Sequence, residues 1–439
     1  MKAIIIGAGI AGLSAAIALK RSIPSLTIEV FELRATPSTI GGAVNLTPNA
    51  LRSLASLGAL ARLQRNACPV RAIDIVSCRT GLKIAALSFD VPRSDGHRAV
   101  RAKRADLLAA LTDTWRELGG AVAYDARVTA IESSSGNGGV RATIAVGGAP
   151  PAAVEADLLL GADGIHSAVR AGFVEPGRAE VYSGVATANG TVRAAEADAG
   201  ARFGLPLEDT AVFASRRGSL LVSFASADRR DVFLGAVMET ADVPSREGWR
   251  ARGQDQDALR AEIYGRFCES GPLAKRFTEV LDLLPDWFVY PVYKLPPGGI
   301  WCKDRVMLLG DAAHAVSQLF MRCYFHMGAN GVKMPPQGES TGFAIEDALL
   351  FSRIMKDAVE RAGDETVDVS AVFARYERNR RKRINEAFAE ADMRWETVKD
   401  KGWLAGVLMD WFTPIWLWWT KSARENNYRY DVTTAELLD

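Results

Sequence analysis

The feature that most constrains the fold is a glycine motif at the start of the chain. GAGIAG follows an apolar stretch and precedes a helical pattern, Leu13 to Lys20. In a strand–turn–helix unit, the first glycine makes the tight turn, the second lets a pyrophosphate approach the backbone, and the third lets the helix pack closely on the strand. Gly7, Gly9 and Gly12 occupy these three positions. The motif therefore predicts a Rossmann-like α/β fold that binds a dinucleotide.

An acidic residue at the end of the next predicted strand supports this prediction. Glu32 directly follows the strand pattern Thr27 to Phe31. In dinucleotide-binding folds, an acidic residue about 20 residues beyond the glycines binds a ribose hydroxyl. Because its charge would repel a 2′-phosphate, the site suits FAD or NAD better than NADP. No second GxGxxG follows a strand elsewhere in the chain.

Two further turns follow apolar strands. GADGIHSAVR, residues 161–170, comes after Ala156 to Leu160, and GDAAHA, residues 310–315, comes after Arg305 to Leu309. Open α/β sheets bind ligands at the carboxyl ends of their strands, although either acidic residue alone could simply form a turn or a helix cap. A helix pattern, Thr341 to Val359, follows. Its first N–H groups are available to an anion.

Together with KRADLL, which contains Arg104, these motifs resemble the single-component (group A) FAD-dependent aromatic hydroxylases, which include salicylate hydroxylase and its fungal relatives. The motifs occur in the family's order and at about its separations. The resemblance implies bound FAD, transient NADPH or NADH, O2 and a small aromatic substrate. In this family the reduced flavin forms a hydroperoxide that transfers oxygen to the ring, so the cofactor carries the difficult chemistry.

The resemblance also assigns roles to individual residues. Most of them would bind the cofactor, whose reduced ring would be stabilised by the start of the helix near residue 340. The implied contacts are Glu32 with the adenosine ribose, Ala43 through its backbone, Arg104 with FAD, Asp163 with the cofactor region, Asp311 with the ribityl chain, and Gly338 and Thr341 at the helix start.

The pattern of predicted strands and helices divides the chain into an FAD-binding domain, an inserted β-rich substrate domain and a C-terminal helical segment. Short apolar strands joined by Arg and Gly turns fill the middle of the chain, and a helical insert, Gln254 to Leu281, crosses them. The predicted boundaries are 1–71, 98–178 and 300–362 for the FAD-binding domain, 72–97 and 179–299 for the substrate domain, and 363–439 for the helices.

Two departures from the family pattern affect the site. In the first long strand of the substrate domain, relatives have an aromatic residue, Arg and Gly, whereas this chain has Ala188, Asn189 and Gly190. An arginine anchor for an acidic or phenolate substrate is therefore in doubt. Asn189 is the candidate for substrate hydrogen bonding, and its alternative role is that of a turn residue at a strand end. No other catalytic side chain is indicated.

The second departure is an anomalous insert, residues 316–333, between GDAAHA and MPPQGESTGFAIEDA. Without it, the two segments join into the family's uninterrupted flavin loop. The codons for its first and last residues can supply intron donor and acceptor sequences, so a retained in-frame intron is one hypothesis. A genuine active-site lid is the other. A transcript that keeps the segment in every read would contradict the intron hypothesis.

Composition indicates an ordinary enzyme. The 439 residues are 48% hydrophobic with a formal net charge of +1, which gives no bias toward nucleic acid. Five cysteines without a CxxC pair and four scattered histidines predict neither a disulfide framework nor a metal site. The apolar N-terminus resembles a signal peptide, but its glycines fit the cofactor turn better. We therefore expect a cytoplasmic protein.

The C-terminus is unusual because five of the ten tryptophans fall between Trp403 and Trp419. Asp410 and Pro414 interrupt this run, which is also short for a membrane span. Packing on the protein's own body or in a homodimer is the favoured interpretation. Weak interfacial membrane contact is the alternative.

The sequence thus predicts an FAD-dependent monooxygenase that uses NAD(P)H and O2 to hydroxylate a small aromatic, and specifically phenolic, compound. Two alternatives stay open. The first is an epoxidase or oxidase of the same fold that acts on a non-aromatic substrate, and product analysis would distinguish it. The second is a catalytically silent product of misannotation, which would lack bound flavin.

Overall fold

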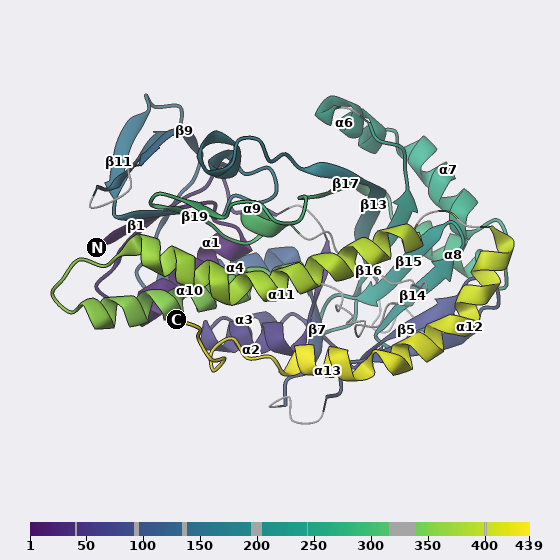
Figure 1. Cartoon of the computed structure of the whole chain (residues 1–439). Helices are drawn as coiled ribbons and strands as arrows, with labels where there is room; N and C mark the ends of the chain where they lie inside the picture. Colours follow the sequence, from purple (N-terminus) through teal and green to yellow (C-terminus); the bar gives the residue numbers. More distant parts are fainter. Residues whose placement is uncertain are drawn as a thin grey trace.

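The computed structural model describes residues 1–39, 42–91, 96–133, 138–194, 204–243, 245–315, 339–398, 400 and 402–439. Figure 1 shows two main β-sheets at opposite ends of the molecule. Long helices from the later part of the chain run between them. The larger hydrophobic core lies around the first sheet, and a second core lies between the other sheet and the helices on its outer face.

The first sheet forms the dinucleotide-binding half. Its order is β18-β19-β12-β1-β2-β8, and the strands are parallel except for β18, which pairs antiparallel with β19. Helices α1 and α10 pack against each other beside this sheet. The elements are β1 (Lys2–Ile6), α1 (Ile10–Ser22), β2 (Thr27–Phe31), α4 (Arg104–Glu117), β8 (Val122–Ala123), β12 (Leu158–Gly161), η1 (Arg170–Val174), β18 (Cys302–Lys303), β19 (Val306–Leu308), α9 (Asp311–His314) and α10 (Glu339–Ala362).

The second sheet has seven strands in the order β17-β13-β16-β15-β14-β5-β6. Two of them come from early in the chain and five from the middle. On one face, alternate residues such as Leu220, Val222 and Leu234 pack against the helices of the predicted helical insert. The strands are β5 (Ala72–Ser77), β6 (Lys83–Ser88), β13 (Val181–Arg193), β14 (Thr210–Ser215), β15 (Gly218–Phe224), β16 (Asp231–Glu239) and β17 (Phe288–Lys294).

The predicted helical insert, Gln254 to Leu281, contains the helices α7 (Gln256–Phe267) and α8 (Ala274–Leu281), and α6 (Arg246–Gln254) directly precedes it. The Asp255 side chain accepts a hydrogen bond from the Ala258 N–H and so starts a new helix. Gly271, with φ near +103°, and Pro272 separate the last two helices.

A small sheet, β3-β7-β4, connects the two halves. In β3 and β7, one set of alternate residues packs into the first core. The other set faces the seven-stranded sheet. Lys103 of this small sheet forms an ion pair of 2.5 Å with the buried Asp231 of β16. The elements here are β3 (Ala43–Leu46), α2 (Pro48–Ser56), α3 (Leu60–Gln64), β4 (Cys68–Val70) and β7 (Ala99–Lys103), and a separate β11-β10-β9 sheet contains β9 (Ala126–Ser133), β10 (Val140–Val146) and β11 (Ala152–Ala156).

The C-terminal segment is helical, with α11 (Val369–Val398), α12 (Trp403–Trp419) and α13 (Lys421–Arg429). Asp410 and Pro414 interrupt the apolar run of α12 but not the helix, which continues through both residues. None of the described helices combines the length and apolarity needed to cross a bilayer.

Candidate functional site

The glycine turn has the geometry that a dinucleotide site needs. Gly7 has φ near +103°, and a Cβ there would lie 2.5 Å from the Ala162 carbonyl oxygen. At Gly12, a Cβ would lie only 1.8 Å from the Gly7 carbonyl oxygen. Both positions therefore require glycine for steric reasons within the protein. By contrast, a Cβ on Gly9 would meet nothing within 4 Å, so this backbone borders open space at the start of α1.

Glu32 reaches from the end of β2 back to the glycine turn. One of its carboxylate oxygens accepts a hydrogen bond from the Ala8 N–H at 2.9 Å, and the other accepts from the Arg34 N–H at 3.0 Å. Each carboxylate oxygen has further lone pairs. The side chain is thus held in a fixed orientation beside the open space at Gly9 and can accept hydrogen bonds from ribose hydroxyls.

Arg104 and Ala43 lie where the small sheet meets α4. The Arg104 N–H donates to the Gly42 carbonyl at 3.0 Å, and its Nε donates to the Thr39 hydroxyl at 3.3 Å. Arg104 begins α4, and Ala43 begins β3 on the neighbouring strand. These bonds bring the two residues together, as a shared role in binding FAD requires.

Asp163 stabilises the turn in which it lies. Its carboxylate accepts from the Ser167 hydroxyl at 2.5 Å and from the N–H groups of Ala168 and Val169 at 2.7 and 3.2 Å. Burial raises the pKa of this carboxyl, while these hydrogen bonds oppose the increase. The structure therefore gives Asp163 a capping role within residues 161–170, and direct cofactor contact stays a prediction.

Asp311 is the first residue of α9 and has no hydrogen bond to any other described residue. The residue is exposed to solvent, yet desolvation by the surrounding protein raises the pKa of its carboxyl. Nearby His314 and Arg104 oppose this increase. An exposed carboxylate without a hydrogen bond to another described residue can accept hydrogen bonds from a partner with several hydroxyl groups, such as the ribityl chain of FAD.

Two buried arginines hold the α9 segment in place, and sequence reasoning missed both. The Arg170 guanidinium donates to the Ala312 carbonyl at 3.0 Å, and the Arg178 guanidinium donates to the Ala313 carbonyl at 3.0 Å. Arg170 belongs to the GADGIHSAVR motif, so this contact physically links two of the family's motifs. Arg170 was visible in the motif, but the carbonyl that it binds lies 142 residues away, so the sequence alone did not show the contact.

An extensive buried polar network joins the α9 segment to α10 and α11. Asp347 accepts from the Gly310 N–H at 2.8 Å, from His314 Nε2 at 2.7 Å and from Arg380 Nε at 2.6 Å. All these side chains are buried. His314 is therefore a structural residue rather than a metal ligand. The attraction of His314 and Arg380 outweighs burial and holds the pKa of Asp347 far below its usual range.

Glu346 directly precedes Asp347 on α10 and belongs to the same network. It pairs with Arg380 at 2.8 Å, with Arg383 through both of its oxygens, and with the Asn49 amide at 2.9 Å. Burial alone would raise its pKa, but the two arginines lower it to about 2. The acidic pair was visible in the sequence, but only the packing of α11 on α10 shows that it is paired.

We expect this network to make stability fall in acid. A carboxylate whose pKa is depressed in the folded state contributes stability above its ordinary pKa of 4.5, and this stability is lost as pH falls toward its folded pKa of about 2. The unfolding temperature should therefore drop steeply below about pH 4.5. Differential scanning calorimetry across this range tests the prediction.

Glu346→Gln should be less stable near neutral pH and should lose less stability on acidification. The matched control is Asp113→Asn, because Asp113 forms only an exposed pair with Arg116. Its acid profile should follow that of the unsubstituted chain. A Glu346→Gln variant that keeps the full acid sensitivity would contradict the assignment to this network.

The predicted helix-start contacts are only partly described. Thr341 is buried in the first turn of α10, which begins at Glu339. Gly338 and the anomalous insert, residues 316–333, lie outside the described residues. Their roles, and the intron hypothesis, stay predictions.

Buried polar groups lie on the face of the seven-stranded sheet that is turned toward the small sheet. Asn189 is buried, and its Oδ1 lies 3.4 Å from where a Cβ on Gly42 would be. It borders a pocket of about 280 Å³. Thr187, two residues earlier on the same face, has a buried hydroxyl without a partner.

Asn45 was not predicted from the sequence. It is 1% exposed, and among the described residues neither its amide nitrogen nor its oxygen has a hydrogen-bond partner. It alternates with Val44 and Leu46, which point into the first core, so it faces the substrate side of the small sheet. Leaving a buried amide unpaired costs about 1–3 kcal/mol for each group, so such a side chain indicates a missing ligand partner.

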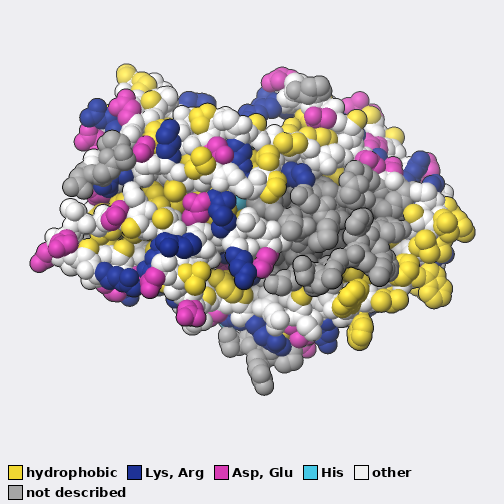
Figure 2. All heavy atoms as spheres, viewed as in Figure 1, with side chains coloured by type: hydrophobic (Ala, Val, Ile, Leu, Met, Phe, Trp, Pro, Cys, Tyr) yellow, Lys and Arg dark blue, Asp and Glu magenta, His cyan; other side chains and the backbone are white. Residues whose placement is uncertain are grey.

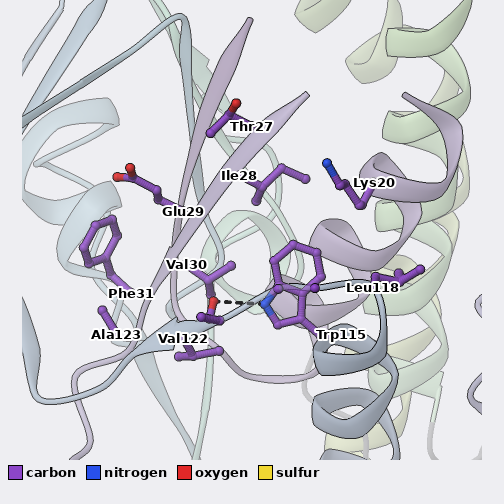
Figure 3. A pocket seen from close by; sticks show the side chains of 13 residues that line it. Lys20, Thr27, Ile28, Glu29, Val30, Phe31, Trp115, Leu118, Val122 and Ala123 are labelled. Atoms are coloured by element: carbon purple, nitrogen blue, oxygen red, sulfur yellow. Dashed lines mark hydrogen bonds between the residues drawn. The ribbon is translucent and has the colours of Figure 1, made fainter. Parts of the chain in front are cut away.

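A larger pocket of about 650 Å³ lies elsewhere, on the outer side of β2 and the end of α4. Figure 3 shows its lining, in which the Trp115 indole is engaged by a hydrogen bond to the Ala121 carbonyl. Lys20, Glu29 and Leu118 form other parts of its wall. None of the predicted site residues lines this pocket, and we place the functional site at the glycine turn and α9 instead.

Comparison with known proteins agrees with this geometry. A family model described as an FAD binding domain matches residues 1–206. An FAD-dependent urate hydroxylase of Klebsiella pneumoniae is 28% identical over 405 residues, which cover 91% of each chain. Salicylate hydroxylase of Pseudomonas putida is 25% identical over 372 residues, covering 82% of this chain and 78% of that protein.

The fold has a counterpart among solved structures. A crystal structure of Klebsiella pneumoniae HpxO complexed with FAD and uric acid superimposes with a TM-score of 0.72 at 23% identity, covering 98% of this chain and 96% of that one. The chain thus contains an FAD binding domain and is similar over most of its length to FAD-dependent hydroxylases. It is an FAD-dependent monooxygenase.

Proposed function

We propose that the enzyme uses NAD(P)H and O2 to hydroxylate a small phenolic or hydroxylated heteroaromatic ring. The observation that carries this proposal is the set of neutral polar side chains, Asn45, Thr187 and Asn189, on two surfaces that face each other. The Asn45 amide and the Thr187 hydroxyl are buried and have no hydrogen-bond partner among the described residues. Relatives named for urate and salicylate hydroxylation support a planar ring substrate. Bound FAD would supply the oxygen-transfer chemistry.

The protein's own part is to hold the cofactor and orient the ring. Glu32 would bind the adenosine ribose, Ala43 and Arg104 the cofactor where β3 meets α4, and Asp311 the ribityl chain. The first turn of α10, with Thr341, would present N–H groups to the negatively charged edge of the reduced ring. A nicotinamide cofactor would bind only transiently, since the chain has one glycine motif of this kind.

Amide and hydroxyl side chains favour a neutral substrate. Asn189 stands where the family resemblance leads us to expect an arginine. An amide offers one donor side and one acceptor side, so it complements a phenol hydroxyl or a ring lactam and gives little attraction to a carboxylate. The proposed substrate class is therefore a ring with hydroxyl or lactam groups that needs no carboxylate anchor.

The decisive experiment measures NADH and NADPH oxidation by the purified holoenzyme with salicylate, urate, 6-hydroxynicotinate and simple phenols. A substrate should stimulate oxidation, and mass spectrometry after reaction in isotopically labelled dioxygen should show one oxygen atom incorporated. A substrate that is oxidised without NAD(P)H, with hydrogen peroxide formed and no labelled oxygen in the product, would indicate an oxidase. Incorporation into an alkene would indicate an epoxidase.

Substitution of the amides is expected to change substrate binding more than the rate of the bound complex. Asn45→Leu and Asn189→Leu should each raise KM about 10- to 200-fold, because a hydrogen bond to the substrate is lost, while kcat falls less. Asn45→Leu should also raise the unfolding temperature of the substrate-free protein, since a buried unpaired amide is removed. A purely structural Asn45 would instead leave KM unchanged.

A further inference from the structure

A continuous apolar surface lies along the outer side of α12. Four tryptophans of this helix are 69–78% exposed, and Leu404, Leu408 and Ile415 are 42–63% exposed. Their spacing of three and four residues places them on one side of the helix. We call this side the α12 surface; its residues are Trp403, Leu404, Leu408, Trp411, Ile415, Trp418 and Trp419. All the highly exposed tryptophans of the described chain belong to it.

The α12 surface lies at the edge of the molecule and carries no charge. Figure 2 shows hydrophobic side chains gathered at the end of the molecule where Figure 1 places α12. Asp410, the charged residue within the helix, is turned inward and accepts hydrogen bonds from Ser77 at 2.7 Å and from Arg79 at 2.8 Å. The inner side of the helix packs on the substrate sheet through Met409, Thr413 and Leu417.

The extent of the surface exceeds what an ordinary protein exterior exposes. A buried aromatic side chain covers about 150–250 Å², so the four exposed indoles alone present roughly 400–700 Å². The largest apolar patch of a typical monomer is about 300–600 Å² in total. The three aliphatic residues add to the indoles. Such a surface indicates an apolar partner.

The chemistry of the indoles decides which partner fits. Each indole has one N–H donor, which needs an acceptor when it is buried. A second copy of α12 would offer an apolar face whose backbone carbonyls are already bonded within the helix, so four donors from each copy would be left unpaired. The boundary of a lipid bilayer offers apolar chains together with water, ester and phosphate oxygens, which is why tryptophan is enriched there.

Basic side chains lie at two places beside the helix. Lys421 lies two residues beyond the end of α12, is 68% exposed and forms a loose ion pair with Glu425 at 3.8 Å. Arg216 is exposed, and its Cβ lies 3.7 Å from where a Cβ on Gly406 would be. These charges complement anionic lipid headgroups.

We propose that α12 lies in the headgroup region of a membrane and attaches the enzyme to its surface. The inserted side is the α12 surface, and Asp410 stays on the protein side of the helix. The helix lies along the interface and does not cross the bilayer, in keeping with its length and its packing on the substrate sheet.

Flotation of the full-length holoenzyme with phosphatidylcholine vesicles, with and without phosphatidylserine, tests this proposal. The protein should float with both vesicle types, and more completely when phosphatidylserine is present. Trp411→Ser combined with Trp418→Ser should lower the bound fraction at least about tenfold. The matched control is Ile300→Ser, because Ile300 is 51% exposed and lies outside the α12 surface; it should float like the unsubstituted chain.

Two accompanying measurements make the result unambiguous. The flavin spectrum and circular dichroism must show that the double variant is folded, and light scattering reports its mass. A folded protein that stays entirely in the soluble fraction overturns the proposal. Vesicle-free dimerisation that the double variant abolishes would assign the surface to a second copy instead. A blue shift of tryptophan fluorescence on vesicle addition, absent in the double variant, supports insertion.

Discussion

Asp347→Asn is expected to destabilise the protein by about 3–5 kcal/mol and to release FAD. The substitution keeps the side chain's size but removes the charge that balances Arg380. Asp347 also binds the Gly310 N–H and His314, at the two ends of the segment that carries Asp311. Loss of these contacts frees that segment from α10, so the residue proposed to bind the ribityl chain loses its fixed position. Chemical denaturation and the visible flavin spectrum measure the two effects.

The matched control is the same substitution on the same helix, Asp357→Asn. Asp357 pairs with Arg361 and Arg375 but is partly exposed, so its loss should cost no more than about 1 kcal/mol and leave FAD bound. If Asp347→Asn does not fold, His314→Gln, which removes one contact, provides a milder test and should weaken FAD binding about tenfold. Unchanged stability and flavin content in both variants would contradict the role of the network.

Alanine substitutions at Gly9 and Gly12 are expected to differ in their effect on stability. Gly9→Ala should leave the apoprotein's unfolding temperature nearly unchanged, because the added Cβ meets nothing within 4 Å. It should nevertheless weaken FAD binding at least about 100-fold, since the methyl group takes the space where the pyrophosphate approaches the backbone. Fluorescence titration of the apoprotein with FAD measures the dissociation constant.

Gly12→Ala should lose both stability and FAD binding, because of a steric clash within the protein. Its Cβ would lie 1.8 Å from the Gly7 carbonyl oxygen, so helix α1 would have to move away from the turn. We expect a loss of stability of at least about 1–3 kcal/mol in the absence of FAD as well as loss of binding. Gly253→Ala, in α6 and equally open, is the control and should change neither property. Normal FAD affinity in Gly9→Ala would exclude this backbone as the phosphate site.

The sequence predicted the first half of the site well because its signals are local. The first strand, turn and helix, the second strand and Glu32 lie within the first 32 residues, and backbone sterics fix how they meet. Glycine conformation and apolar periodicity depend only on neighbouring residues. The family, the FAD cofactor and the monooxygenase class followed from these motifs and are confirmed by the comparisons.

Helix boundaries were less predictable where neighbouring structure compensates a local break. Proline disfavours a helix interior, but α12 continues through Pro414 while its inner side packs on the substrate sheet. The segment from Gln254 to Leu281 is predicted only as helical, and capping at Asp255 and the turn at Gly271 set where its two helices begin and end.

Sequence alone determined the cofactor fold, the enzyme class and the order of the binding motifs, because each is encoded in short stretches whose geometry depends on the residues themselves. Only the tertiary structure decided which charges pair and which polar groups are left unpaired. Asp347 pairs with Arg380, and Asn45 finds no partner among the described residues, because of how distant elements pack. The free energy of a buried polar group depends on what lies opposite it, and that neighbour comes from another part of the chain.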